Sequence, residues 1–136
     1  MNLEAARILR SRGVFAALWN DRVIEGVPWM EEFQALIEGY NPAHRRDYRD
    51  FDVAERMGRG GVFTDFASHE IPNEWEVDSS QFVGFARTLS YVRNVVTPTD
   101  LGRFEAEVRK LVTAMHGSGR FVVPMKTNIT IGRKTG

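Results

Sequence analysis

The stretch Ala6-Arg-Ile-Leu-Arg-Ser-Arg-Gly-Val-Phe-Ala-Ala-Leu-Trp-Asn-Asp-Arg22 decides the fold class of this chain. Its first half is a basic amphipathic segment, and Gly13 suits the left-handed conformation that often follows a helix. Its second half holds an apolar run, Val14 to Trp19, which is typical of a strand covered on both faces. We therefore predict a helix that leads into a buried strand. Such a unit normally lies inside a doubly wound α/β sheet, with parallel strands before it, whereas here it opens the chain.

The middle of the sequence predicts helices separated by a polar segment. Pro28 suits the first turn of a helix whose apolar residues recur at spacings of three and four, and Asn41-Pro42 ends it. A short helix is expected near Phe51 to Met57, before Gly58. The loose alternation over Val62 to Val77 then favours an edge or antiparallel strand, bent at Pro72 and Asn73.

The last part of the sequence predicts two helices and a strand. Asp78 is a natural N-cap for a helix that should end near Asn94. Thr97-Pro98-Thr99-Asp100 is a second start signal, for a helix that runs to Gly117. From Phe121 to Ile131, apolar residues alternate with polar or small ones, which indicates the clearest strand in the chain.

These segments together resemble class I S-adenosylmethionine-dependent methyltransferases, most of all the trans-aconitate methyltransferase-like (methyltransferase type 11) branch. Arg7 to Arg22 resembles the helix, glycine turn and fifth strand of that family. Further matches follow in the family's order: Pro28-Trp29 opening a helix, Gly61-Val-Phe63 opening a strand, Arg87-Thr-Leu-Ser-Tyr91 in a later helix, and a final strand around Thr127 to Arg133. The resemblance covers only the back half of the family, whose members place several strands and a glycine-rich cofactor turn before this point.

The resemblance implies a single α/β domain over residues 1–136 with a partial Rossmann-like fold. We expect about three strands in a mixed sheet, with the last strand inserted antiparallel between the other two, and about four to five helices packed on it.

The cofactor site of the family has no counterpart in this sequence. A doubly wound fold holds its cofactor with a glycine-rich turn after the first strand. Gly58-Arg-Gly-Gly61 is the nearest pattern, but it precedes a strand, and a turn is its default interpretation. We expect no cofactor in this chain alone, although the resemblance implies S-adenosylmethionine for a complete family member.

Four residues are candidates for substrate binding, and none is a candidate for catalysis. Trp19 and Asn20 lie past the end of the first strand, where ligands of open α/β sheets bind. Arg87 and Tyr91 are four apart, so on one helix a guanidinium and a phenol could both reach the carboxylate of a small-molecule acceptor. The alternative is that Tyr91 packs by its ring and Arg87 is a surface cation.

Composition excludes several classes of protein. Eighteen basic and eighteen acidic residues cancel, and no long run of one sign occurs, so we expect no nucleic-acid partner. The chain has no cysteine, and no apolar run is long enough for a membrane span or a signal peptide, which favours a cytoplasmic protein. The three histidines, His44, His69 and His116, are too far apart in sequence to predict a zinc site.

Two functions remain open. The chain could be the substrate-side portion of a methyltransferase, unable to bind S-adenosylmethionine or transfer a methyl group alone. It could instead be a noncatalytic methyltransferase-like module that acts through self-association or partner binding. In both cases the strand at 14–19 would present an uncovered edge, so we predict a homo-oligomer that buries it.

Overall fold

A computed structural model describes residues 2–47 and 50–136 of the chain. In this part it contains six helices and three strands: α1 (Asn2–Ile8), β1 (Val14–Arg22), α2 (Pro28–Tyr40), α3 (Val53–Gly58), β2 (Phe63–Val77), α4 (Ser79–Thr88), α5 (Ser90–Arg93), α6 (Pro98–His116) and β3 (Phe121–Lys134). The chain divides into two compact units. The sheet unit comprises Met1–Asp21, Asp50–Asn73 and Met125–Gly136, and the helical unit comprises Arg22–Arg49 and Glu74–Pro124. The single domain over residues 1–136 stays a prediction.

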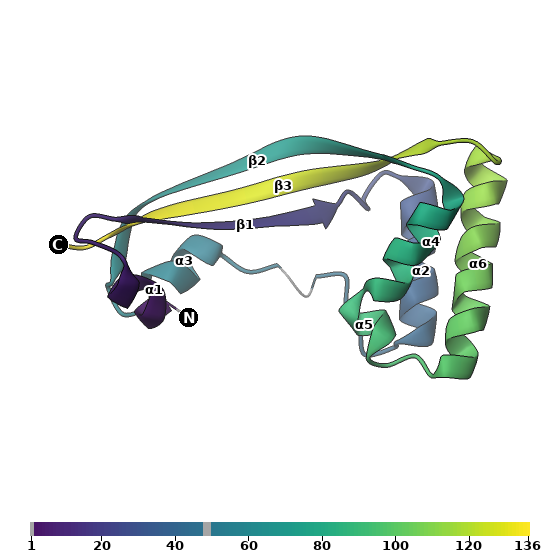
Figure 1. The fold of residues 1–136 in the computed structure, drawn as a ribbon, viewed down its shortest axis with the longest axis horizontal. Helices are drawn as coiled ribbons and strands as arrows, with labels where there is room; N and C mark the ends of the chain where they lie inside the picture. Colours follow the sequence, from purple (N-terminus) through teal and green to yellow (C-terminus); the bar gives the residue numbers. More distant parts are fainter. Residues whose placement is uncertain (1, 48–49) are drawn as a thin grey trace. The chain divides into compact units, whose positions relative to one another are not determined.

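The three strands form one sheet in the order β1-β3-β2, and each neighbouring pair is antiparallel (Figure 1). Two backbone hydrogen bonds at one end of the sheet fix its register. The amide of Lys134 donates to the carbonyl of Gly13 at 2.7 Å, and the amide of Thr135 donates to the carbonyl of Val62 at 3.1 Å. The last strand of the chain is therefore the central strand of the sheet.

This sheet confirms part of the predicted fold and corrects part of it. The α/β class and the position of the last strand between the other two are as expected. The inserted strand is antiparallel to both neighbours, as predicted. The sheet was wrongly predicted to be mixed, however, because in the described part no two neighbouring strands are parallel. The helices in the described part number six, against the predicted four to five.

The extra helix arises where one long helix was expected from residue 79 to near Asn94. α4 ends at Thr88, and α5 begins only after Leu89, whose backbone is extended at φ −56° and ψ 125°. The hydroxyl of Thr88 donates to the carbonyl of Phe85 at 2.7 Å. A side-chain bond of this kind competes with the helical ladder, which accounts for the break.

β1 is not covered on both faces, so that prediction was also wrong. Exposed and half-buried residues alternate along it, and Val14 and Leu18 keep 47% and 61% of their surface exposed. The other face carries Phe15, whose ring centre lies 5.5 Å from that of the buried Phe63. An edge strand has one neighbour, and β1 buries only the face on which Phe15 lies.

A glycine allows close packing in the sheet unit. A Cβ atom on Gly132 of β3 would lie 2.6 Å from Cε1 of Phe66 and 3.2 Å from the methyl group of Met57. The same ring also borders Gly58, where a Cβ would come within 3.3 Å of it. The ring of Phe66 therefore occupies a slot between the end of α3 and the middle strand, and only glycine leaves room for it.

The helical unit packs α2, α4 and α6 around an aromatic core. Phe33, Phe82 and Phe104 are fully buried, and the rings of Phe33 and Phe82 meet edge to face at 5.0 Å. The predicted helix starts are confirmed. Asp78 forms a capping box with Gln81, and the Thr97 hydroxyl accepts a hydrogen bond from the backbone amide of Asp100. The sequence signals for these helices were local, which is why they could be found without the fold.

No helix in the described ranges is long and apolar enough to cross a membrane.

The slot at Gly132 yields a stability prediction. Gly132→Ala forces the Phe66 ring to move and should lower the free energy of unfolding by about 1–3 kcal/mol, the usual cost of overpacking. Urea unfolding followed by circular dichroism measures this change. In a Phe66→Ala background the same substitution should cost much less, because only the contact with the flexible Met57 side chain at 3.2 Å remains.

A matched control lies in α6. Gly102 is helical and a Cβ there meets nothing within 4 Å. Gly102→Ala should therefore stabilise the protein, by about 0.5–1 kcal/mol. A destabilising Gly102→Ala, or an equal loss from Gly132→Ala with and without Phe66, would contradict this account of the packing.

Candidate functional site

The four predicted substrate residues fall into separate groups. Trp19 and Asn20 lie at the end of β1, in the sheet unit. Arg87 lies on α4 and Tyr91 on α5, in the helical unit. The sequence predicts that Arg87 and Tyr91 lie on successive turns of one helix. They do not, because the helix breaks at Leu89.

Trp19 belongs to a polar cluster that joins β1 to β3. One carboxylate oxygen of Asp21, Oδ2, accepts hydrogen bonds from Trp19 Nε1 and from Asn128 Nδ2, each at 2.8 Å. Trp19 and Asp21 are two residues apart on a strand, so they share a face. The shared carboxylate orients both the indole and the amide.

Asn20 lies on the opposite face of the sheet, since it alternates with Trp19 and Asp21. Its Oδ1 accepts a hydrogen bond from the hydroxyl of Thr127 at 2.7 Å, and Asn73 Nδ2 contacts the same hydroxyl oxygen at 3.4 Å. The structure therefore does not place Trp19 and Asn20 in one site.

A pocket of about 300 Å³ lies beside the Trp19 cluster. It is lined by Trp19, Phe51, Val53, Ser68, His69, Glu70, Asn128, Ile129 and Thr130. Within it, the hydroxyls of Ser68 and Thr130 lie 3.1 Å apart. At its edge, Lys126 donates to Glu70 at 2.8 Å, and this hydrogen bond raises the pKa of Lys126. Aromatic walls with an amide and two hydroxyls can bind a small polar ligand without any charged anchor.

The polar members of this pocket were missed at the level of sequence. The alternation from Phe121 to Ile131 indicates only that Asn128 and Thr130 are polar positions of a strand. That alternation does contain the signal, because Lys126, Asn128 and Thr130 occur at every second position and must share a face. The sequence could not reveal that Trp19 and Ser68 would lie on the same face of the neighbouring strands.

Tyr91 is held in a network of the helical unit. Its hydroxyl accepts a hydrogen bond from Arg22 Nη2 at 2.9 Å, and its ring stacks on His44 with 4.0 Å between ring centres. Arg22 Nη2 also contacts Gln34 Oε1 at 3.3 Å, and the guanidinium lies 5.0 Å from the centre of the Phe33 ring. Tyr91 thus packs by its ring, as in the alternative interpretation.

Arg87 pairs with an acid instead of facing Tyr91. Its Nε lies 3.4 Å from Glu105 Oε1 of α6, and just over half of its side chain is exposed. An exposed pair of this kind contributes little to stability. This placement favours a surface cation over an anchor for a carboxylate ligand.

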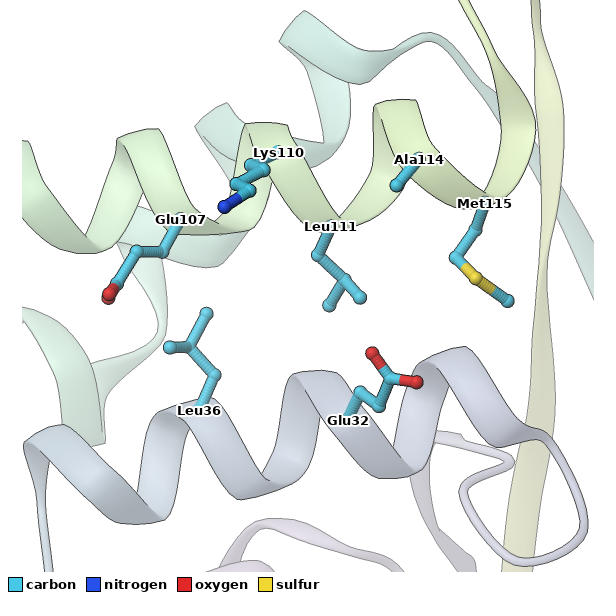
Figure 2. Close-up of a pocket in the computed structure, with 7 residues that line it drawn as sticks. All are labelled: Glu32, Leu36, Glu107, Lys110, Leu111, Ala114 and Met115. Carbon is cyan, nitrogen blue, oxygen red and sulfur yellow. The ribbon is translucent and has the colours of Figure 1, made fainter.

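A second hollow lies between α2 and α6, with a volume of about 390 Å³. Figure 2 shows its seven side chains, which project from the two helices into the space between them: Glu32, Leu36, Glu107, Lys110, Leu111, Ala114 and Met115. At one end, Tyr40 donates its hydroxyl proton to Glu107 at 2.5 Å; burial and this bond raise the pKa of Tyr40 to about 12. The groove combines an apolar floor with charged rims.

The glycine pattern at 58–61 forms a turn into β2. Gly60 and Gly61 have φ angles of 87° and 68°, which glycine adopts without strain, and the amide of Gly61 donates to the carbonyl of Gly58 at 3.0 Å. The turn precedes a strand and leads into no helix, so it does not fit a cofactor's phosphate or ribose. Across residues 2–47 and 50–136, no group of three or more His, Cys, Asp or Glu side chains could hold a metal ion.

Comparison with known proteins found no matching family model and no match among curated proteins.

The contributions of Tyr91 and Arg87 to the free energy of unfolding should differ, and the difference can be measured. Tyr91→Phe removes the acceptor for Arg22 and should lower the free energy of unfolding by about 1 kcal/mol or more. Arg87→Ala removes only an exposed ion pair and should change it by less than about 0.5 kcal/mol. Urea titration of the two variants beside the parent protein gives both values. A larger loss from Arg87→Ala than from Tyr91→Phe would contradict the placement of these side chains.

His44, which is buried, and His116, which is half-buried, predict how stability depends on pH. Burial lowers the pKa of His44, the charge of Arg22 lowers it further, and burial also lowers the pKa of His116. The unfolded chain therefore takes up protons at a higher pH than the folded one. The free energy of unfolding should fall as the pH drops below about 6.5. For each histidine the loss is up to about 1.4 kcal/mol per unit by which folding lowers its pKa.

Unfolding in urea at pH 7.5 and at pH 5.5 measures this loss. His44→Phe and His116→Phe keep an aromatic ring against Tyr91 and Phe121 but cannot take up a proton, so each should reduce the loss. His69→Gln is the matched control, since its side chain is exposed. Equal losses in all four proteins would refute the role of His44 and His116.

Proposed function

We propose that this chain is the acceptor-side portion of a methyltransferase fold, and that it does not hold S-adenosylmethionine by itself. The observation that carries the proposal is the strand order β1-β3-β2. Insertion of the final strand between two earlier ones, antiparallel to both, is the arrangement that the resemblance of residues 7–22 and 127–133 to these enzymes implies. Residues 23–27 lead from β1 directly to Pro28 at the start of α2 and form no glycine-rich turn. This supports the proposal that the chain does not hold S-adenosylmethionine by itself.

The acceptor side of the proposal centres on the pocket beside Trp19. The Asp21 carboxylate holds the indole and Asn128 in place, and the pocket lies on the same face. Because Lys126 is paired with Glu70 and Arg87 with Glu105, neither cation favours a carboxylate ligand. A small neutral acceptor with polar substituents therefore fits this pocket better than the carboxylic acid suggested by Arg87.

A noncatalytic module is the second candidate, and the edge position of β1 favours it. In the order β1-β3-β2, β1 has β3 as its one neighbour in the described part of the sheet. Under this candidate the chain acts by self-association through the edge of strand 14–19. No nucleic-acid partner and a cytoplasmic location stay predictions under both candidates.

Calorimetric titration with S-adenosylmethionine tests the proposal. We expect no one-to-one binding to this chain alone, and no shift of its melting temperature. A ligand at 100 times its dissociation constant would stabilise the folded state by about 2.7 kcal/mol, so a true site would be readily detected. Clear one-to-one binding to a single copy would overturn the proposal.

A second experiment separates the two candidates. The chain is co-expressed with a polypeptide that carries the glycine-rich cofactor half of a class I methyltransferase, and methyl transfer from radiolabelled S-adenosylmethionine is measured. An acceptor-side portion should give labelled product only when both polypeptides are present, and Trp19→Ala should reduce it. A noncatalytic module should give none in either case.

A further inference from the structure

The two edge strands of the sheet differ in how they are protected from pairing. β2 carries a non-glycine residue with positive φ, Asp65 at 52°, together with several charges and a proline: Asp65, Glu70, Pro72, Glu74 and Glu76. Charges, proline and local distortion are the devices by which proteins block an edge strand. β1 has none of these over the seven residues Val14–Asn20.

β1 is also incompletely covered on both faces. Val14 and Leu18 are exposed on one face, while Phe15, Ala17 and Trp19 on the other are only half-buried. An uncharged, flat and partly exposed edge is a template for another strand. A second copy of β1 offers the same uncharged run, so its pairing with this edge places no charge against the apolar residues.

We propose that two copies of this chain pair their β1 strands antiparallel about a two-fold axis at Ala17. This inference rests on the self-association proposed for strand 14–19 and adds its register. An axis perpendicular to the sheet keeps each face on the same side in both copies. The uncharged run is symmetric about Ala17, because Val14 and Asn20 are each three residues away.

Neighbouring registers are less favourable. If the axis moved to Ala16, Asn20 would pass the end of the second copy's β1 and meet the turn at Arg12, whose φ is 61°. With the axis at Leu18, Val14 would lie opposite Arg22. Either shift brings a charged residue against the uncharged run. Only the axis at Ala17 pairs the run with itself over its whole length.

The register at Ala17 also has a consequence for the pocket. Trp19 lies opposite Phe15 of the second copy, on the face that carries the pocket, and Leu18 lies opposite Ala16 on the other face. Each copy would thus place an aromatic ring beside the Trp19 wall of the other copy's pocket. The dimer would complete two ligand sites that a single copy leaves open.

The absence of cysteine allows a direct test of this register. Ala16→Cys, Ala17→Cys and Leu18→Cys are made singly, so each protein carries one thiol. Opposite residues in an antiparallel pair have Cα atoms about 4.5–5.5 Å apart, which is within the range of a disulfide. Mild oxidation should give a covalent dimer fastest with Ala17→Cys. Equal rates for the three variants, or a faster rate for either neighbour, would overturn the register.

Sedimentation velocity of the unmodified protein tests the pairing itself. A reversible dimer of the 15.5 kDa chain is expected at tens of micromolar. Leu18→Lys adds a charge to the β1 edge and should weaken the dimer by at least about tenfold. Ile71→Lys is the matched control, because Ile71 is a similarly exposed apolar residue on β2, and it should leave the dimer unchanged.

Each result bears on a separate statement. A monomer at every concentration would overturn the dimer and leave the acceptor-side assignment intact. One-to-one binding of S-adenosylmethionine would overturn the acceptor-side assignment and leave the dimer intact. Equal weakening by Leu18→Lys and Ile71→Lys would also overturn the pairing through β1. Circular dichroism shows that each variant is folded, and the cysteine variants test the register even if Leu18→Lys does not fold.

Discussion

Hydrogen bonding of the last strand to both earlier strands is the constraint on which the sheet depends. β3 is the only strand in the described sheet with two neighbours, so β1 and β2 are held in register through it. The amide of Lys134 fixes one side of this register and that of Thr135 fixes the other. The polar face that carries Trp19, Asn128 and Ser68 exists only because this central strand aligns residues far apart in sequence.

The two groups of polar residues have different chemical characters. In the sheet unit, the Asp21 carboxylate accepts hydrogen bonds from the indole and the amide that it orients. The neighbouring pocket offers hydroxyl and aromatic groups, together with His69 and with Glu70, which is paired with Lys126. In the helical unit, Arg22 and Tyr91 contact each other and pack against His44 and Phe33. The first arrangement leaves room for a ligand, whereas the second stabilises the join between α2 and α5.

Local signals made several elements predictable, while others depended on contacts distant in sequence. The helix starts at Asp78 and Thr97 follow from side-chain capping, and the start at Pro28 follows from the fixed φ of proline; the structure confirms all three. The run Val14 to Trp19 gave the strand but not its burial, because covering a face requires other parts of the chain. The expectation that Arg87 and Tyr91 share one helix was wrong for a related reason: α4 ends at Thr88, and the backbone of Leu89 separates it from α5.

The sequence by itself determined which segments are helical or extended, where most helices begin, and that the chain lacks thiol chemistry and a strong net charge. These properties arise from side-chain periodicity, capping groups and composition, which act over a few residues or over the whole chain at once. Only the tertiary structure decided the strand order, the exposure of β1 and the residues that surround Trp19. Those properties depend on which distant segments share hydrogen bonds, and β3, at the end of the chain, supplies them.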